Sequence, residues 1–291
     1  MQIELKDLRM EYGETTALDE LTFTMAPGAI HGLLGRNGSG KTSLLSVIAG
    51  FRKQTSGEVL VNGEPVFENP HVVRDIALIR ESGDTVEDSE KVSEAFRYAG
   101  YLRPNWDAEY AAELMDKFEV STDSKIESLS RGKKSVVGIA LGLAARAPLT
   151  MFDETYLGMD APSRYLFYDE LLRDYMENPR TFILSTHLIE EVSRVFENVV
   201  IIDKGQLVVQ DESDALLSRG VAMTGPADQV DALSAGLTII GERQLGRTKS
   251  AMVYGKVDEA AREQARAAGI EFEALDFQDL FVHLTNPSGG R

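Results

Sequence analysis

Residues 35–42 are Gly-Arg-Asn-Gly-Ser-Gly-Lys-Thr, and this stretch decides the fold class. It matches the phosphate-binding pattern G-x-x-x-x-G-K-[ST] at every fixed position. Glycines without a Cβ let backbone N–H groups curl around a phosphate, and the helix that follows points its partly positive N-terminus at the same anion. Residues 29–34 are predicted to form a buried strand that enters the loop, and residues 43–49 a helix that leaves it. This setting favours a phosphate-binding loop over an ordinary glycine-rich turn.

The side chains of the loop predict a nucleoside triphosphate as the ligand. Lys41 adds a full charge for the β- and γ-phosphates, and Thr42 offers a hydroxyl to Mg²⁺. The residues predicted to bind the nucleotide here are Gly35, Arg36, Asn37, Gly38, Ser39, Gly40, Lys41, Thr42 and, in the helix that follows, Ser43.

Composition bounds the class of protein. A length of 291 residues predicts about two domains, and an apolar content of 43% is enough for a large core. The sequence has no apolar run of about 18 residues, no secretory signal and no cysteine, which fits a cytoplasmic protein. The formal net charge of −17 disfavours binding to nucleic acid and direct binding to anionic lipid. Any link to a membrane is therefore expected to run through a protein partner.

The order of predicted elements indicates an α/β fold. Alternating apolar residues at 3–8 and 21–25 predict an antiparallel layer ahead of the loop, and Asn62-Gly63 predicts a hairpin turn after a strand. From residue 149 to residue 202, strands alternate with helices, which is typical of a parallel sheet covered on both faces. We expect the first domain to span residues 1–218.

Two further segments complete the predicted organisation. A helical subdomain is expected at about residues 85–146, with a break in its first helical stretch near Pro104. A small accessory α+β domain of ferredoxin-like type is predicted at residues 219–285. Its role is open: it could be a regulatory module, a dimerisation module or a cover for a sheet edge. The tail, residues 286–291, is expected to be disordered.

Two adjacent acids end the predicted buried strand at residues 149–152. Asp153 can hold Mg²⁺ from the strand end, while Glu154 can reach a water that attacks the γ-phosphate. Consecutive strand residues point to opposite sides, so the pair is expected to divide these roles. The alternative is a strand end that meets solvent with two exposed acids.

The segment Leu129-Ser130-Arg131-Gly132-Lys133 lies just before this strand. With the two motifs above, it makes residues 1–218 resemble the ATP-binding subunits of ABC transporters, whose signature is LSGGQ. The resemblance implies a P-loop ATPase with a mixed β core, a helical subdomain and an antiparallel β layer. It names ATP and Mg²⁺ as ligands, and Glu154, His187 and Lys41 as the catalytic residues.

Other landmarks of that family fall in the expected order. The resemblance implies that Tyr12 stacks on adenine, that Asp160 belongs to a loop contacting a second subunit, and that His187 orients the water and the γ-phosphate. Each has a plainer alternative, namely a surface aromatic, the start of a helix and a helix cap. Trp106 is expected to pack within the helical subdomain.

The resemblance also implies partners. Two ATPase subunits, identical or paralogous, would pack head to tail around two ATP molecules. Ser130 and the Gly132 backbone of one subunit would contact the γ-phosphate held by the other, and hydrolysis would release the pair. An integral membrane subunit on a separate chain would place the protein at the inner face of the cell membrane.

The sequence departs from the family pattern at several positions. The family glutamine between the loop and the signature has no counterpart, and Glu81 is the best match, unless it is a solvated loop acid. A carboxylate there adds negative charge near the triphosphate, which Mg²⁺ or Arg80 could offset. Arg131 and Lys133 replace a glycine and a glutamine of the signature, and Thr155 replaces a proline, which affects the stiffness of the loop.

These observations predict the ATP-hydrolysing motor subunit of an ABC transporter, and the resemblance is closer to bacterial exporters. The alternatives are a soluble ABC-type ATPase or a low-turnover nucleotide sensor, each without a membrane partner. The sequence does not identify the cargo.

Overall fold

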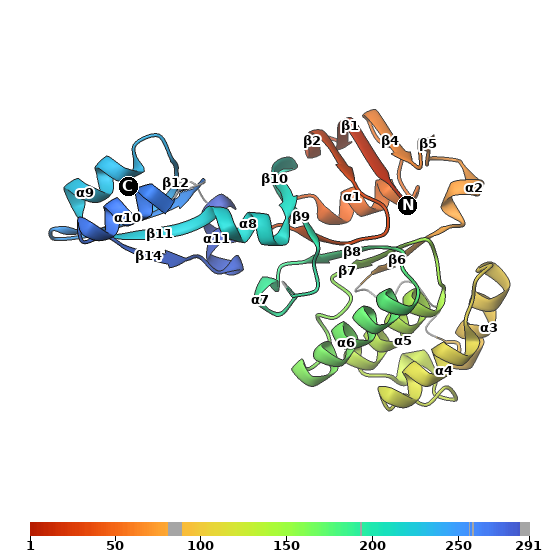
Figure 1. Cartoon of the computed structure of the whole chain (residues 1–291). Helices are drawn as coiled ribbons and strands as arrows, with labels where there is room; N and C mark the ends of the chain where they lie inside the picture. The colour runs from red at the N-terminus through yellow and green to blue at the C-terminus, as the bar shows by residue number, and fades with distance from the viewer. Residues whose placement is uncertain (81–88, 193, 256, 258, 286–291) are drawn as a thin grey trace. The chain divides into compact units, whose positions relative to one another are not determined.

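The computed structural model describes residues 1–80, 89–192, 194–255, 257 and 259–285. They form two compact units, Met1–His187 with Arg194–Leu207, and Leu188–Ser193 with Val208–Arg291 (Figure 1). Glu81 and the tail 286–291 lie outside the described residues, so nothing tests what was expected of them. The domain boundaries expected from the sequence stay predictions.

The first unit opens with an antiparallel sheet. Its strands are β1 (Ile3–Tyr12), β2 (Thr15–Met25), β4 (Ser56–Val61) and β5 (Glu64–Pro65), in the order β2-β1-β4-β5. The turn between β4 and β5 has positive φ at both Asn62 (51°) and Gly63 (79°), as a two-residue hairpin of this kind requires. The antiparallel layer and hairpin predicted from alternation and Asn-Gly are therefore both present.

The chain's central sheet has six strands in the order β10-β9-β3-β8-β7-β6, of which β9, β3, β8, β7 and β6 lie wholly in this unit. Neighbours among β3, β6, β7, β8 and β9 pair in parallel. Their continuous apolar runs predicted burial on both faces, and every residue of β3, β7 and β8 is buried. The strands are β3 (Ile30–Leu34), β6 (Ile76–Arg80), β7 (Leu149–Asp153), β8 (Thr181–Thr186), β9 (Asn198–Asp203) and β10 (Gln206–Glu212).

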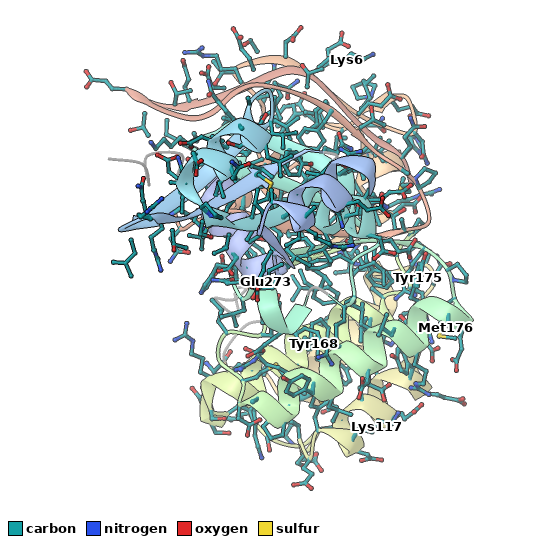
Figure 2. All side chains as sticks on the ribbon, turned by 60° about the vertical axis from the view of Figure 1, so that its left-hand side comes forward. Lys6, Lys117, Tyr168, Tyr175, Met176 and Glu273 are labelled. Carbon is teal, nitrogen blue, oxygen red and sulfur yellow. The ribbon has the colours of Figure 1, made fainter. Side chains whose placement is uncertain are left out.

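The helical part of this unit contains α3 (Val92–Leu102), α4 (Ala108–Lys117), a short 3-10 turn (Ile126–Ser128), α5 (Arg131–Ala144) and α6 (Ala161–Glu177). The predicted break near Pro104 separates α3 from α4, and Asp107 caps α4 by accepting a hydrogen bond from the Tyr110 amide. Lys117 of α4 lies 2.6 Å from Glu170 of α6, which joins the two helices; Figure 2 marks Lys117 on α4 and Met176 on α6.

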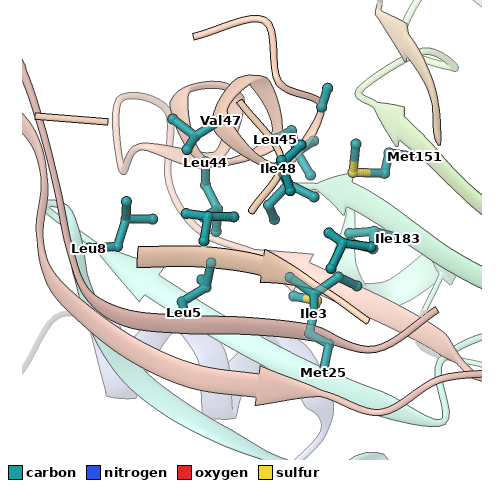
Figure 3. Close-up of a cluster of buried hydrophobic side chains, with 14 of the residues drawn as sticks. Ile3, Leu5, Leu8, Met25, Leu44, Leu45, Val47, Ile48, Met151 and Ile183 are labelled. Carbon is teal, nitrogen blue, oxygen red and sulfur yellow. The ribbon is translucent and has the colours of Figure 1, made fainter. Parts of the chain in front are cut away.

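The core of the first unit lies between the two sheets and α1 (Lys41–Ile48). Figure 3 shows its side chains meeting from β1, α1, β7 and β8, so that the helix after the glycine-rich loop is fixed by burial. The fully buried side chains of this core that Figure 3 draws include Ile3, Leu5, Leu8, Met25, Leu44, Leu45, Ile48, Met151 and Ile183.

The remaining helix of the first unit is the single turn α2 (Pro70–Val73). It begins at Pro70, directly after Asn69, which caps it.

The second unit is an antiparallel sheet with helices. Strands β11 (Gly220–Pro226), β12 (Thr238–Leu245), β13 (Thr248–Tyr254) and β14 (Glu271–Ala274) lie in the order β12-β13-β11-β14. The chain order β11-α9-β12-β13-α10-β14 is the βαββαβ arrangement of ferredoxin-like folds. Its helices are α7 (Ile189–Val192), α8 (Ser213–Arg219), α9 (Ala227–Ser234), α10 (Glu259–Ala267) and α11 (Phe277–Thr285).

Two details differ from the sequence expectations. The helix expected at about residues 188–195 is only the single turn α7, and strand β10 with helix α8 was not anticipated. Strand β10 alternates between exposed and half-buried residues, so it lacks the strong apolar signal of its neighbours. Within the described part of the chain, we find no helix with the length and apolar character needed to cross a bilayer.

Candidate active site

A cavity of about 590 Å³ lies where the glycine-rich loop meets the carboxyl ends of β6, β7 and β8. Parallel strands end at a common edge, so side chains that follow different strands converge there. Its lining residues are Thr15, Thr16, Ala17, Asn37, Gly38, Gly40, Lys41, Thr42, Ser43, Arg80, Asp153, Glu154, Leu157 and His187.

The loop owes its shape to backbone positions that only glycine adopts easily. Gly38 has φ of 80° and Gly40, which caps α1, has φ of 106°. A Cβ added to Gly40 would lie 2.5 Å from the carbonyl oxygen of Ala17, a distance no side chain tolerates. The loop therefore packs tightly against the chain at Ala17 and presents the start of α1 to the cavity, as an anion site at a helix N-terminus requires.

Lys41 is the central cation of the cavity. Its side chain is only 5% exposed, and its Nζ lies 3.2 Å from Glu154 Oε1. The same ammonium donates hydrogen bonds to the carbonyl oxygens of Gly35 (2.7 Å) and Arg36 (3.3 Å). A buried ammonium held at the loop mouth can bind a phosphate oxygen that reaches the loop.

The two acids predicted as a pair occupy different surroundings, but not for the reason expected. Strand β7 ends at Asp153, and Glu154 has a left-handed φ of 51°, so simple alternation along a strand does not separate them. The Glu154 amide donates to the carbonyl oxygen of Ser185 (3.2 Å), which fixes this turn against β8. A positive φ is uncommon for residues other than glycine, and Glu154 shares it with Glu20, Glu68 and Glu119 of this chain.

His187 meets Glu154 across the cavity. Its Nδ1 shares a hydrogen bond of 3.1 Å with Glu154 Oε2, while the other carboxylate oxygen of Glu154 lies beside Lys41. Glu154 is thus held from both sides, by a cation from the loop and an imidazole from the end of β8. The structure thus brings together three residues that were selected from separate motifs, and their catalytic roles stay predictions.

The site also has oxygen donors that suit a divalent cation. Asp153 is buried, and its Oδ1 has no hydrogen-bond partner among the residues that the structure describes. Thr42 lines the same cavity and carries the hydroxyl that the sequence assigned to Mg²⁺. Hard oxygen ligands in small number, completed by phosphate oxygens, are what Mg²⁺ prefers. The residues present therefore fit this metal.

The signature residues lie outside the lining of this cavity. Ser130 caps α5, where its Oγ accepts a hydrogen bond from the Lys133 amide (3.3 Å), and Gly132 follows in the first turn. A Cβ on Gly132 would lie 2.8 Å from the carbonyl oxygen of Gly158, so the signature packs closely on the loop that leads to Asp160. Asp160 caps α6 by accepting a hydrogen bond from the Ser163 amide (2.9 Å). The alternative role given to Asp160, as the start of a helix, is therefore present in the structure.

Two aromatic candidates also lie away from the lining. Tyr12 ends β1 with 42% of its surface exposed, and its stacking on adenine stays a prediction. Trp106 is half-buried and packs on Phe96, with ring centroids 5.6 Å apart, so it packs within the helical part. Sequence reasoning did not select Thr15, Thr16 and Ala17, because no local pattern marks β2 as a neighbour of the loop.

A second cavity, of about 860 Å³, is larger than the first. It lies near the amino ends of β7 and β8, where Pro148 and Arg180 precede the strands. Arg180 lies 2.5 Å from the buried Asp174, which also pairs with Arg146. Burial, together with the charge of Arg146, lowers the pKa of Arg180 to about 10. Arg146 also pairs with Asp107 at 3.0 Å. Both arginines that line this cavity therefore have acidic partners within the chain.

Comparisons with known proteins bear on the first cavity. A family model described as ABC transporter matches residues 18–156, which run from the approach to the loop to just past Glu154. An uncharacterised ABC transporter ATP-binding protein of Methanocaldococcus jannaschii is 31% identical over 71% of this chain and 76% of its own. Nod factor export ATP-binding protein I of Cupriavidus metallidurans is 26% identical over 97% of each chain.

Solved structures support the fold. An ATP-binding subunit of an ABC transporter superposes with a TM-score of 0.66 at 24% identity, covering 74% of this chain and 92% of that one. A dimeric ATP-binding cassette in a post-hydrolysis state, bound to ADP and Pi, gives a TM-score of 0.65 at 20% identity, covering 72% and 98%. At these identities the likeness concerns the fold alone.

Proposed function

The chain belongs to the ABC transporter ATP-binding proteins, and on this basis we propose that it is the ATP-hydrolysing motor subunit of such a transporter. The observation that carries the proposal is the convergence of Lys41, Glu154 and His187 on one cavity beside the glycine-rich loop. A nucleoside triphosphate offers the phosphates that the loop and Lys41 are built to hold.

In the proposed reaction, Glu154 takes a proton from water as the water oxygen attacks the γ-phosphorus. The bond from that phosphorus to the β–γ bridging oxygen breaks, leaving ADP and phosphate. His187 keeps the Glu154 carboxylate oriented through the bond at its Nδ1. Lys41 neutralises charge on the phosphates, and its Nζ, 3.2 Å from Glu154 Oε1, helps to hold that carboxylate in place.

We assign Mg²⁺ to Thr42 and Asp153. The metal, when bound, neutralises charge on the β- and γ-phosphate oxygens. The buried Asp153 Oδ1, without a partner among the described residues, supports this assignment.

We further propose that two such subunits act as a head-to-tail pair. Ser130 and Gly132 lie outside the lining of the cavity formed by the loop of their own chain, which supports a role on the nucleotide of a second chain. The close contact between Gly132 and Gly158 supports one continuous dimer-facing surface that includes Asp160. The second chain is a copy of this one or a paralogue.

A separate integral membrane subunit is the remaining partner, and it would hold the protein at the cytoplasmic face of the membrane. Exposed apolar side chains on α3 support a protein contact there: Tyr98 is 46%, Tyr101 77% and Leu102 76% exposed. Export is the favoured direction, because the relative that matches 97% of each chain is an export ATP-binding protein. Neither nucleic acid nor lipid is a proposed partner, given the net charge of −17.

The test is the variant Glu154→Gln, with the exposed Glu177→Gln on α6 as its control. We expect the first to lose ATP turnover by about 10²–10⁴-fold and to accumulate an ATP-bound dimer on gel filtration. The control should hydrolyse ATP at the wild-type rate and stay in the wild-type oligomeric state. Wild-type turnover by Glu154→Gln would rule out the role assigned to this residue.

A further inference from the structure

Arg80 is a second cation in the candidate active site and has no role in the mechanism above. It is the last residue of β6 and pairs in register with Asp153, the last residue of β7. Because these strands are parallel, both residues reach the same edge of the sheet. Arg80 accordingly lines the cavity together with Lys41, Thr42 and Glu154.

Contacts on both sides hold the Arg80 side chain. Its Nη2 donates to Ser46 Oγ at 3.0 Å, and that hydroxyl donates to the carbonyl oxygen of Thr42 at 2.5 Å. The guanidinium also lies over the Phe51 ring, 5.2 Å from its centroid. Arg80 is therefore connected, through Ser46, to the turn of α1 that carries Thr42.

The charges that line the cavity show what Arg80 contributes. Among the described lining residues, Lys41 and Arg80 are the permanent cations, and Asp153 and Glu154 are the carboxylates. Lys41 already lies beside Glu154, so Arg80 is the cation left to balance the second carboxylate and the incoming phosphates. The planar, permanently charged guanidinium suits phosphate oxygens. Its Nε has no partner within the described stretches of chain.

We propose that Arg80 is a positioning and selectivity residue that braces the Thr42 turn through Ser46 and favours a triphosphate over a diphosphate by its charge. The inference rests on the proposed function, because it concerns the same nucleotide. The γ-phosphate adds negative charge at the end of the nucleotide that faces the strand edge, so a fixed cation there stabilises ATP more than ADP.

The experiment compares the dissociation constants of ADP and of the β,γ-imido analogue of ATP, both with Mg²⁺, by isothermal titration calorimetry. We expect Arg80→Met to weaken binding of the analogue about tenfold and that of ADP less than about threefold. Arg80→Lys, which keeps the charge, should stay within about threefold of the wild-type preference. Arg74→Met removes an exposed arginine just before β6 and should change neither constant.

The outcomes separate the two proposals. A wild-type chain that binds neither nucleotide overturns the proposed function and this inference with it. Wild-type binding, combined with equal weakening of both nucleotides in Arg80→Met or no weakening at all, overturns the inference alone. If Arg80→Met does not fold, Arg80→Gln replaces it, because it removes the charge and keeps a polar side chain that can reach Ser46 Oγ. Arg80→Gln should then lower the preference for the triphosphate, and an unchanged preference overturns the inference.

Discussion

The first unit holds two charged cavities at opposite ends of its parallel strands, and the smaller one is the candidate active site. The cavity at the amino ends is about 860 Å³ and the cavity at the carboxyl ends about 590 Å³. At the amino ends, two arginines share the buried Asp174 and one of them also holds Asp107. At the carboxyl ends, Asp153 Oδ1 has no partner among the described residues. The difference lies in ion pairs, because Asp174 has two arginine partners whereas Asp153 has no ion-pair partner among the described residues.

The physical reason is the cost of burying charge. A buried ion pair whose partners satisfy each other holds elements together and has little left to offer a ligand. A buried carboxylate oxygen without a partner is tolerated where a cation from outside can complete it. The amino-end cluster is therefore a structural clamp between α5, α6 and β8, and the carboxyl-end group is the candidate binding site.

The largest effect on stability is expected when Asp174, the acid that both arginines of the amino-end cluster share, is removed. We expect Asp174→Ala to lower the free energy of unfolding by about 3–5 kcal/mol, because two guanidinium groups lose their shared buried partner. Urea unfolding followed by circular dichroism measures the change. Asp169→Ala, an exposed acid on the same helix, is the control and should be nearly neutral. Nucleotide affinity of the folded Asp174→Ala chain should match wild type, and a large loss of affinity would contradict the division between the two cavities.

The variant Lys41→Ala tests the other cavity, where we expect a loss of activity and not of stability. Removing this buried cation should lower ATP turnover by about 10²–10³-fold, the range seen when one preorganised donor to a transition-state anion is lost. The melting temperature should change little, because the partner Glu154 still contacts His187. A coupled phosphate-release assay measures turnover, and Lys53→Ala on the exposed segment after α1 is the matched control. Full activity in Lys41→Ala would remove the basis for the proposed site.

The burial of His31 is expected to change the stability of the fold by a smaller amount, and this change depends on pH. Burial in β3 lowers the pKa of His31 below its ordinary value of 6.5, although its Nε2 lies 2.8 Å from the Ala26 carbonyl oxygen. The unfolded chain then binds more protons than the folded one, so stability is full above pH 6.5 and falls as the pH drops below that value.

Thermal unfolding between pH 7.5 and 5 measures the His31 effect. We expect His31→Gln to show a shallower fall in melting temperature than wild type over this range. His71→Gln, at an exposed position in α2, should follow the wild-type curve. Parallel curves for wild type and His31→Gln would show that this histidine does not titrate between the two states.

The smallest effect is expected at a surface ion pair that belongs to neither cavity. Lys6, marked in Figure 2, lies 3.8 Å from Glu4 and 3.9 Å from Glu58, and its side chain is 52% exposed. Lys6→Ala should change the free energy of unfolding by less than about 1 kcal/mol, with the difference vanishing in salt. A larger loss would show that exposed pairs contribute as much as the buried clamp, and the contrast drawn above would fail.

Local chemistry made much of the candidate site predictable. Residues 35–42 specify the loop because glycine, lysine and threonine act within a single turn, and Asp153 ends a strand that apolar composition alone identifies. The helix limits at Ser130 and Asp160 followed from capping. Strand β10 was missed because its residues are at most half-buried and carry little apolar signal.

The sequence by itself determined which residues are the candidates for the chemistry, since motifs of a few residues encode the loop, the acids and the histidine. Only the tertiary structure decided which of them meet. The strand order β3-β8-β7-β6 brings Lys41, Glu154, His187 and Arg80 to one edge, although they are far apart in the chain. It also gives Glu154 its left-handed backbone and matches Arg146 and Arg180 to one acid at the opposite edge. Strand order depends on pairing between distant segments, and local periodicity does not specify it.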